Sequence, residues 1–418
     1  MKQIAFAILA AFSFGLFAYN LTHFIKIALL GREQKLPETT GERIGSLFKF
    51  FFGQRKVAEE RRSWHHLAIY WGFLVLSIAS ADMMATGLLG EWFNFGVLLT
   101  EPVYAYLQWV IDWANFVVFL VMIFAISRRF IRPAFVPLSL DAMLILGAIT
   151  LLTISHFGHH GFNMAAEGHF HSSNPVSAYF AMLLGAHSLG AVYQANIDPD
   201  TALIISEVFW WVHIGILLAF LNYLPFSKHI HVLGSGPNIF FRNQGQRGAM
   251  PKVALFDGDP DDPDAEPLFD NWGVGKIEDF TWKSLIDNYS CTECARCTTY
   301  CPAFATDKPL SPMHLIHDLK DEMKERGNLL LELKKAGGSL AEPDEDDDEA
   351  SESEAAPAAN QNLIDKIKAD LEALPPLVGG RVKDETLWAC TTCGACQEVC
   401  PVFIDHPLKI LQMRQHIV

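Results

Sequence analysis

The chain has 418 residues, of which 50% are hydrophobic and only 19% are charged. It is therefore too long for one small domain and too apolar for a disordered chain, so two or three domains are expected. The formal net charge of -15 at pH 7 excludes a protein that binds nucleic acid through its phosphates, because such binding rests on clustered Lys and Arg. Nine acidic residues lie in one run, "EPDEDDDEASESE", which supplies most of the charge imbalance and whose composition predicts a solvated segment.

Up to about residue 232, the chain contains apolar segments long enough to cross a bilayer. A hydrocarbon core of roughly 30 Å takes about 20 apolar residues in a helix. The first candidate has Lys2 ahead of a long apolar run, as a signal peptide does, but it lacks a small-residue cleavage site and continues to Leu30. It is therefore expected to be a span. Five spans are predicted at about 3–30, 65–89, 102–127, 138–157 and 202–226.

The charges of the connecting loops predict the orientation. Eight Lys or Arg lie within 32–62 and three more follow the third span, whereas 133–227 contain none. The positive-inside rule then places the N-terminus outside and everything after Ser227 in the cytoplasm of a multi-pass protein of the cell (inner) membrane. A sixth apolar piece begins at Val176 and would break this parity if it crossed, so it is expected to be an interfacial or re-entrant helix.

All eight cysteines belong to two copies of the motif C-x2-C-x2-C-x3-C-P, "CTECARCTTYCP" and "CTTCGACQEVCP". Ferredoxins with two [4Fe-4S] clusters use this spacing, because three thiolates on a tight turn hold one cluster while the fourth reaches the other. The alternative, structural zinc, prefers separated CxxC pairs, so iron-sulfur clusters are favoured. We assign one cluster to Cys291, Cys294, Cys297 and Cys400, and the other to Cys390, Cys393, Cys396 and Cys301.

The residues around these motifs predict helices. Ser311-Pro312 is typical of a helix start, and an amphipathic pattern follows it as far as Gly337-Gly338. Further helices are expected near 360–373 and from about His406. The predicted fold is mainly α: a five-helix transmembrane cytochrome b bundle (1–232), a linker (233–288), and a soluble α-helical ferredoxin domain (289–418) with two [4Fe-4S] clusters and an acidic insertion at about 340–360.

Histidines in the membrane half suggest haem, because ionisable groups in a bilayer are costly and are candidates for function. His213 and His231 are 18 residues apart, which is five helical turns, so they are expected on one face of the last helix and its extension. His66 opens the second span at its cytoplasmic end. We predict that His66 and His231 hold a b-type haem between the second and fifth spans.

A second haem is possible and would use His213. Its partner would come from the outer end of the fourth span, which supplies His156, His159 and His160, and we assign His156 as that ligand. A hydrated loop that binds metal ions is an equally weighted interpretation of these three residues. Three carboxylates in the outer halves of the spans are candidates for relaying quinone protons, although such groups are more often helix-terminal or hydrated: Asp82, Asp112 and Glu207.

Two stretches resemble known families. "LPFSKHIH", which follows "WVH", resembles the last helix of the cytochrome b subunit of respiratory nitrate reductase, which implies haem ligands at His213 and His231. "KIEDFTWKSLIDNYSCTECARCTTYCPAFATDKPLSP" is similar to membrane-bound iron-sulfur oxidoreductases related to heterodisulfide reductase, a family that includes electron-transfer flavoprotein:menaquinone oxidoreductases.

This chain departs from the two families at two points. The second span lacks the second histidine that the nitrate reductase subunit uses for its outer haem. The iron-sulfur family usually continues into two cysteine-rich CCG domains, which this sequence does not contain. Either a separate partner carries that part, or the chain is a portion of a longer one.

The expected function is electron transfer in the membrane, by a quinone-linked oxidoreductase or an electron-transfer subunit of one. A cytoplasmic partner, such as a reduced electron-transfer flavoprotein or a CCG-domain reductase subunit, would exchange electrons with quinone in the lipid bilayer through two [4Fe-4S] clusters and haem b. No pattern for a catalytic nucleophile or triad occurs, and no nucleic-acid partner is expected. The alternatives are an iron-sulfur module of a heterodisulfide- or sulfite-reductase-linked complex, and a zinc-binding membrane protein.

Overall fold

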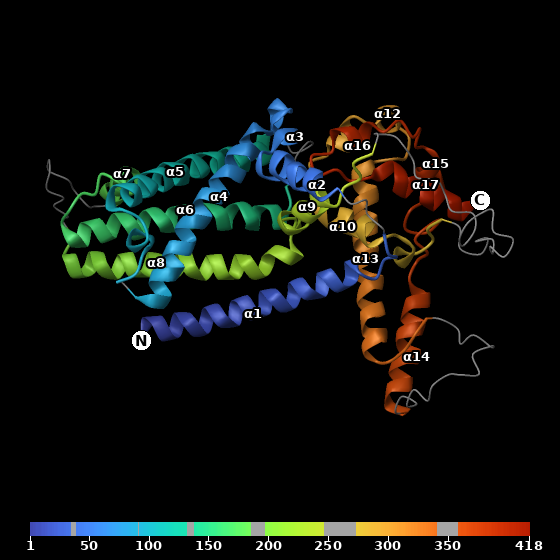
Figure 1. Ribbon diagram of the computed structural model, residues 1–418, viewed down its shortest axis with the longest axis horizontal. Helices are drawn as coiled ribbons and strands as arrows, with labels where there is room; N and C mark the ends of the chain where they lie inside the picture. Colours follow the sequence, from blue (N-terminus) through green and yellow to red (C-terminus); the bar gives the residue numbers. More distant parts are fainter. Residues whose placement is uncertain (35–38, 91, 132–137, 185–196, 246–272, 341–357) are drawn as a thin grey trace. The chain divides into compact units, whose positions relative to one another are not determined.

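The computed structural model describes residues 1–34, 39–90, 92–131, 138–184, 197–245, 273–340 and 358–418 (Figure 1). These residues form helices and two isolated β-bridges, and they contain no strand, which confirms the predicted mainly α fold. The chain divides into two compact units. The first comprises 1–20 and 57–228, and the second comprises 21–56 and 229–418. The helix α1 (Lys2–Ala28) begins in the first unit and ends in the second.

The long apolar helices confirm the five predicted spans. Besides α1, four segments are long and apolar enough to cross a membrane: α4 (Trp64–Leu89), α5 (Glu101–Ile131), α6 (Leu140–Glu167), and α8 (Pro199–Tyr223) with its 3-10 extension η4 (Leu224–Phe226). Many of their large apolar side chains are exposed, as expected for a surface that meets lipid. The protein is therefore a membrane protein.

Within the first unit, α6 lies between α5 and α8 and packs against both (Figure 1). Val118 and Met122 of α5 are buried against Leu146 of α6. Short 3-10 turns η2 (Arg61–Ser63) and η3 (Phe95–Val97) flank α4. The apolar piece that begins at Val176 forms α7 (Pro175–Leu183), which is too short to cross a bilayer and packs on α5 and α6. The rest of this piece, 185–196, lies outside the described residues.

The three carboxylates proposed for proton relay all have structural partners. Asp112 accepts hydrogen bonds from the backbone N–H of Val176 (2.6 Å) and the hydroxyl of Ser177 (2.5 Å), where a negative charge favours the start of α7. Glu207 forms an ion pair with Lys2 (2.6 Å). Asp82 accepts from the backbone N–H of Phe95 and from the side chains of Tyr104 and Gln108. These contacts fix loops and helix ends within the unit.

The last span does not continue to His231, so one expectation is wrong. The helix α8 ends at Tyr223, η4 contains Pro225, and α9 (Ile230–Phe240) is a separate helix. Proline has no N–H for a helical hydrogen bond, and Asp141 of α6 holds the break by accepting from the Tyr223 hydroxyl (2.5 Å) and the Lys228 N–H (3.1 Å). His213 and His231 therefore do not share a face of one helix.

The second unit is built from short helices around one core. Its elements are α2 (Thr40–Ser46), the π-helical turn η1 (Leu47–Phe52), α9, η6 (Ile277–Asp279), α10 (Trp282–Ser290), α11 (Arg296–Thr299), α12 (Pro302–Ala305), α13 (Pro312–Lys335), α14 (Ala358–Ala373), α15 (Asp384–Trp388), α16 (Ala395–Val399) and α17 (His406–Ile417), while α3 (Arg55–Ala58) lies at the boundary of the two units. Three predicted helices are confirmed as α13, α14 and α17. The core includes Ile27 from the end of α1 and Phe280 and Leu285 from the predicted linker.

The described part of the predicted linker is thus packed structure. Ile277 and Phe280 are fully buried, and α9 contacts α10 and η1. The loop after α1 also belongs here, because Arg43 donates a hydrogen bond to the Phe240 carbonyl (2.9 Å) and Arg242 donates to the Ser46 hydroxyl (3.0 Å). The boundaries 1–232, 233–288 and 289–418 stay a prediction.

We expect Ser311→Ala to lower the free energy of unfolding of the second unit by about 1 kcal/mol. The Ser311 hydroxyl accepts from the His314 N–H at the start of α13 and lies 2.9 Å from the Thr298 hydroxyl of α11. Ser311→Thr keeps the cap and should lose little. Urea denaturation of the detergent-solubilised protein, followed by helical circular dichroism, measures the difference, and equal stability of the three proteins would contradict the capping role.

Candidate iron-sulfur centres

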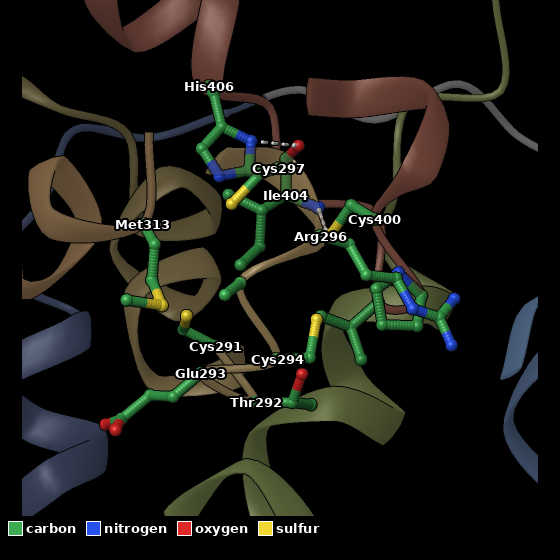
Figure 2. A pocket seen from close by; sticks show the side chains of 13 residues that line it. Cys291, Thr292, Glu293, Cys294, Arg296, Cys297, Met313, Cys400, Ile404 and His406 are labelled. Atoms are coloured by element: carbon green, nitrogen blue, oxygen red, sulfur yellow. Dashed lines mark hydrogen bonds between the residues drawn. The ribbon is translucent and has the colours of Figure 1, made fainter. Parts of the chain in front are cut away.

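Four cysteines from the two distant motifs line one cavity of the second unit. These are Cys291, Cys294, Cys297 and Cys400, the set predicted to hold one cluster (Figure 2). The cavity wall also contains Arg296, Met313, Val402, Ile404 and His406. All eight cysteines of the chain are free thiols. Thiolate sulfur is the donor that [4Fe-4S] clusters require, so this donor set fits the predicted group.

The two motifs share one local conformation. Glu293 and Ala295 have left-handed backbones (φ 51° and 59°), and so do Thr392 and Gly394 at the same places in the second motif (φ 56° and 73°). Non-glycine residues adopt this conformation at some cost, which is tolerated at functional sites. The resulting tight turn brings the first three cysteines of a motif to one side, and a short helix, α11 or α16, then carries the third.

Backbone N–H groups point at the sulfurs. The N–H of Thr392 lies 3.3 Å from the sulfur of Cys390, and the N–H of Ile404 lies 3.3 Å from the sulfur of Cys400. Such hydrogen bonds favour the negatively charged thiolate, and they are one of the factors that set the reduction potential of a bound cluster.

The fourth cysteine of each motif lies close to the first three cysteines of the other motif, as the mutual effects of these thiols on their pKa values indicate. The pKa of Cys400 is raised to about 12, mainly by burial and in part by the neighbouring Cys294 and Cys291, against the hydrogen bond from the Ile404 N–H. Burial likewise raises the pKa of Cys396 to about 12, with contributions from Cys390, Cys301 and Cys393. These buried thiols keep their protons at neutral pH until a metal replaces them.

The two sets of cysteines approach each other. The pKa of Cys297 is raised by burial and then by neighbouring cysteines, which include Cys396 of the other set. Two clusters held by these cysteines would lie next to each other, so that electrons could pass from one cluster to the other. Within the described ranges, no group of three or more His, Cys, Asp and Glu side chains is placed to hold a single metal ion.

A buried charge cluster, Asp287 with Lys283 and Lys409, joins the chain before the first motif to the chain after the second. Asp287 of α10 is fully buried and accepts from Lys283 (2.7 Å), from Lys409 of α17 (3.3 Å) and from the Asp405 N–H (3.3 Å). Burial alone would raise the pKa of Asp287, but the two ammonium groups hold it below its ordinary value. The ion pairs therefore tie α10 and α17 together beside both motifs.

His406 belongs to the cavity, although the sequence indicated only that a helix starts there. Its side chain is 1% exposed, and its Nδ1 donates to the Ile404 carbonyl (3.2 Å), while its buried Nε2 has no hydrogen-bond partner in the described structure. Burial lowers the pKa of His406 to about 4, opposed by Asp287. Only its position six residues after Cys400 could have drawn attention to it.

Among the membrane histidines, the structure brings His156 and His213 together. Their ring centroids are 6.3 Å apart, between α6 and α8. The Nδ1 of His213 donates to the Leu152 carbonyl (3.1 Å), and the Nε2 atoms of both rings are buried with no hydrogen-bond partner among the described residues. Histidines that bind metal usually donate their other ring N–H to such a carbonyl. The pair therefore fits the chemistry of haem ligands.

The other two candidate neighbours of His213 differ from His156. The Nδ1 of His159 lies 3.0 Å from the Ser206 hydroxyl, and the ring of His160 is tilted against that of His156, with 4.5 Å between their centroids. His66 lies in the first turn of α4 in the first unit, and His231 lies in the first turn of α9 in the second unit. The pairing of His66 with His231 stays a prediction.

Comparisons with known proteins agree with the iron-sulfur part. A family described as a 4Fe-4S dicluster domain matches residues 283–401. The match and the five apolar helices define the class, a membrane protein with a 4Fe-4S dicluster domain, and favour iron-sulfur over zinc.

Three curated relatives are similar to the chain. It is 29% identical over 421 residues to the probable iron-sulfur-binding oxidoreductase FadF of Bacillus subtilis (strain 168), covering 100% of this chain and 56% of that protein. It is 30% identical over 388 residues to the EtfAB:quinone oxidoreductase of Syntrophomonas wolfei, covering 90% of this chain and 49% of that protein. It is 36% identical over 165 residues to a probable membrane-anchored ferredoxin of Chromohalobacter salexigens, covering 38% of this chain and 20% of that protein.

The chain spans about half the length of the first two of these relatives. Their names confirm the resemblance to iron-sulfur oxidoreductases and the expectation of an oxidoreductase or of an electron-transfer subunit. No solved structure matches the chain.

Proposed function

We propose that this protein transfers electrons between a cytoplasmic redox partner and the quinone pool of the membrane. The partner is a reduced electron-transfer flavoprotein or a CCG-domain reductase subunit. The observation that carries the proposal is the cavity lined by Cys291, Cys294, Cys297 and Cys400, in a chain with five apolar helices. A relative whose name includes both EtfAB and quinone supports the choice of partner and substrate.

The cysteines would hold the clusters in the crossed arrangement: Cys291, Cys294, Cys297 and Cys400 for one, and Cys390, Cys393, Cys396 and Cys301 for the other. When bound, [4Fe-4S] clusters and haem supply one-electron transfer, which connects two-electron flavin chemistry to two-electron quinone chemistry. The chain's own residues bind and orient these groups, and burial of Cys291 and Cys400 keeps water from the sulfurs.

We also propose haem b in the membrane domain. His66 and His231 would hold the haem nearest the cytoplasm, and His213 with His156 would hold a second. Support for the second pair comes from the buried, unpartnered Nε2 atoms of both rings and from the carbonyl that orients His213. The ferredoxin domain would face the cytoplasm of a cell (inner) membrane with the N-terminus outside, as the positive-inside pattern of the loops indicates.

The test measures cofactors and electron transfer on the detergent-solubilised protein. About eight non-haem irons and eight acid-labile sulfides per chain are expected, with a b-type band in the reduced-minus-oxidised spectrum. Reduced electron-transfer flavoprotein should then reduce a soluble quinone analogue only in the presence of this protein. A colourless preparation, or one without a b-type band, contradicts the proposed path.

We expect His231→Ala to abolish the haem nearest the cytoplasm and to leave both clusters in place. An alanine cannot ligate iron, whereas the eight cysteines are unaffected by this change. Haem content by the pyridine haemochrome assay, together with iron and sulfide content, measures both effects. His229→Ala is the matched control on the same turn, and haem retained in His231→Ala would contradict the ligand assignment.

A further inference from the structure

The second unit contains an apolar cavity that the cluster chemistry does not use. Residues of η1 and α9, with Phe241 directly after α9, line this cavity, which is widely open to the surface and has a volume of about 430 Å³. The lining includes four phenylalanine rings and aliphatic side chains, with no charged or polar side chain among the lining residues: Leu47, Phe51, Phe52, Val232, Phe240 and Phe241. This volume is within the range of small-molecule sites, which are lined mainly by apolar and aromatic groups.

A glycine keeps the cavity open. Gly236 is a buried residue of α9 and lines the cavity. A Cβ added there would lie 3.6 Å from the ring of Phe51, which is ordinary contact, so the space beyond Gly236 is bounded by that ring. A longer side chain at this position would occupy the cavity itself.

The helix that lines the apolar cavity also contacts the loop that follows Cys400. The side-chain amide of Asn238 donates to the Val402 carbonyl (2.8 Å), and Val402 lines the cysteine cavity. The ring of Phe50 packs on Phe403 (4.8 Å between centroids), next to the guanidinium of Arg242 (4.7 Å from the same ring). Residues of the two elements that line the apolar cavity therefore directly contact the loop that forms part of the wall of the cysteine cavity.

The position of α9 in the chain favours a ligand from the membrane. Ile230 begins α9 four residues after η4 ends the last predicted span at Phe226. Exposed apolar side chains at Ile44, Phe48 and Phe52 flank the cavity on the α2–η1 segment. Exposed apolar surface of this kind marks a site of contact with lipid or with an apolar ligand.

We propose that this cavity binds the ring and the first isoprenoid units of a quinone, which exchanges electrons with the cluster held by Cys291, Cys294, Cys297 and Cys400. This inference rests on the proposed function. A planar quinone ring stacks on phenylalanine, whereas a hydrophilic partner gains nothing from an uncharged cavity. Such a site gives the clusters a direct connection to the quinone pool, in addition to the route through haem.

The reaction balances with the electron donor already named. Reduction of one quinone to quinol takes two electrons, which leave a reduced flavoprotein and arrive singly through the clusters, and two protons, which come from the solvent. The flavoprotein is oxidised by the same two electrons. Oxidation of a quinol reverses each of these transfers.

The test uses Gly236→Leu, which fills the cavity, and Gly45→Leu as the matched control. Gly45 lies in α2, where an added Cβ meets nothing within 4 Å, so the same change leaves the cavity open. The full-length protein is labelled with a photoreactive naphthoquinone that carries a short isoprenoid tail, and the labelled peptides are mapped by mass spectrometry. Electron paramagnetic resonance of the dithionite-reduced protein verifies that both clusters are present.

We expect the label on η1 and α9 in the wild type and in Gly45→Leu, and about tenfold less of it in Gly236→Leu, with unchanged cluster signals. Phe52→Ala provides a second variant if Gly236→Leu does not fold, because Phe52 is 37% exposed and its loss spares the core. Removing its ring should weaken quinone labelling about fivefold.

Label that maps elsewhere, or that persists fully in Gly236→Leu, overturns the site. So does label that excess phospholipid removes and unlabelled quinone does not, because the cavity would then hold a lipid chain. Failure of the proposed function would look different: no quinone would reoxidise the reduced clusters of the wild type. Reoxidation is therefore compared in the His231→Ala background, in which the haem route is closed, and reoxidation that there continues at the same rate with and without Gly236→Leu contradicts the site alone.

Discussion

Replacing Cys400 with alanine is expected to remove the cluster that the first motif holds and to leave the cluster of the second motif. Cys400 belongs to the second motif by sequence, but it lines the cavity of Cys291, Cys294 and Cys297. A [4Fe-4S] cluster that loses one of four thiolates in a buried site loses iron or fails to assemble. Iron should therefore fall from about eight to about four atoms per chain, apart from haem iron.

The electron paramagnetic resonance signal of the cluster that remains in each variant shows which cysteines hold the same cluster. Cys400→Ala should leave the same electron paramagnetic resonance signal as Cys291→Ala. Cys301→Ala should instead match Cys390→Ala, because Cys301 contributes to the environment of the Cys390 and Cys396 thiols. If each motif held its own cluster without crossing, Cys301→Ala would match Cys291→Ala, and this outcome would contradict the assignment.

The grouping of Cys291, Cys294, Cys297 and Cys400 around one cavity could be predicted because its signal is local. Three cysteines at fixed spacing on one turn bind one cluster wherever the turn lies in the fold, and the fourth is too far along the chain to join them. Helix starts at Ser311 and His406 were also predictable, since capping and proline at the first turn act within a few residues.

The break between His213 and His231 depends on a distant residue. Helical periodicity assigns a shared face only if the helix continues, and Pro225 by itself permits either a kink or an end. Asp141, more than eighty residues earlier, binds Tyr223 and Lys228 and fixes the end of the last span. No pattern near His213 could have shown this.

Other parts of the site required packing that composition does not reveal. The proximity of His156 to His213 depends on how α6 and α8 pack, and the sequence could only name His156 as a candidate beside His159 and His160. Asp287 and His406 look like ordinary surface residues in sequence, because nothing local indicates that they are buried. The packing of the loop after α1 into the second unit was likewise not visible from its basic charges, which predicted orientation only.

Asp287→Asn should destabilise the second unit by about 3 to 5 kcal/mol. The carboxylate is fully buried between Lys283 and Lys409. The Lys409 ammonium is also fully buried, and within the described structure its one further acceptor is the Ser284 carbonyl (2.5 Å). Removing the negative charge leaves two ammonium groups close together away from water, which costs more than the lost ion pair contributes. Urea denaturation followed by the visible absorption of the clusters measures the change.

Two further variants and a pH series separate this effect from a general loss of charge. Lys409→Met should cost less than Asp287→Asn, because Lys283 stays paired with Asp287 at 2.7 Å. Asp365→Asn on the exposed side of α14, where the carboxylate accepts a hydrogen bond from Gln361, should change stability by less than about 0.5 kcal/mol. Because the pKa of Asp287 is held below its ordinary value, its contribution is fully present above about pH 4 and is lost only as the pH falls through the folded pKa. The difference between wild type and Asp287→Asn should therefore be constant above about pH 6 until the buried Lys409 ammonium, whose pKa burial lowers and Asp287 raises, loses its proton in the variant. A difference that grows as the pH falls from about 6 to 5 would show that another group, such as His406, carries the effect.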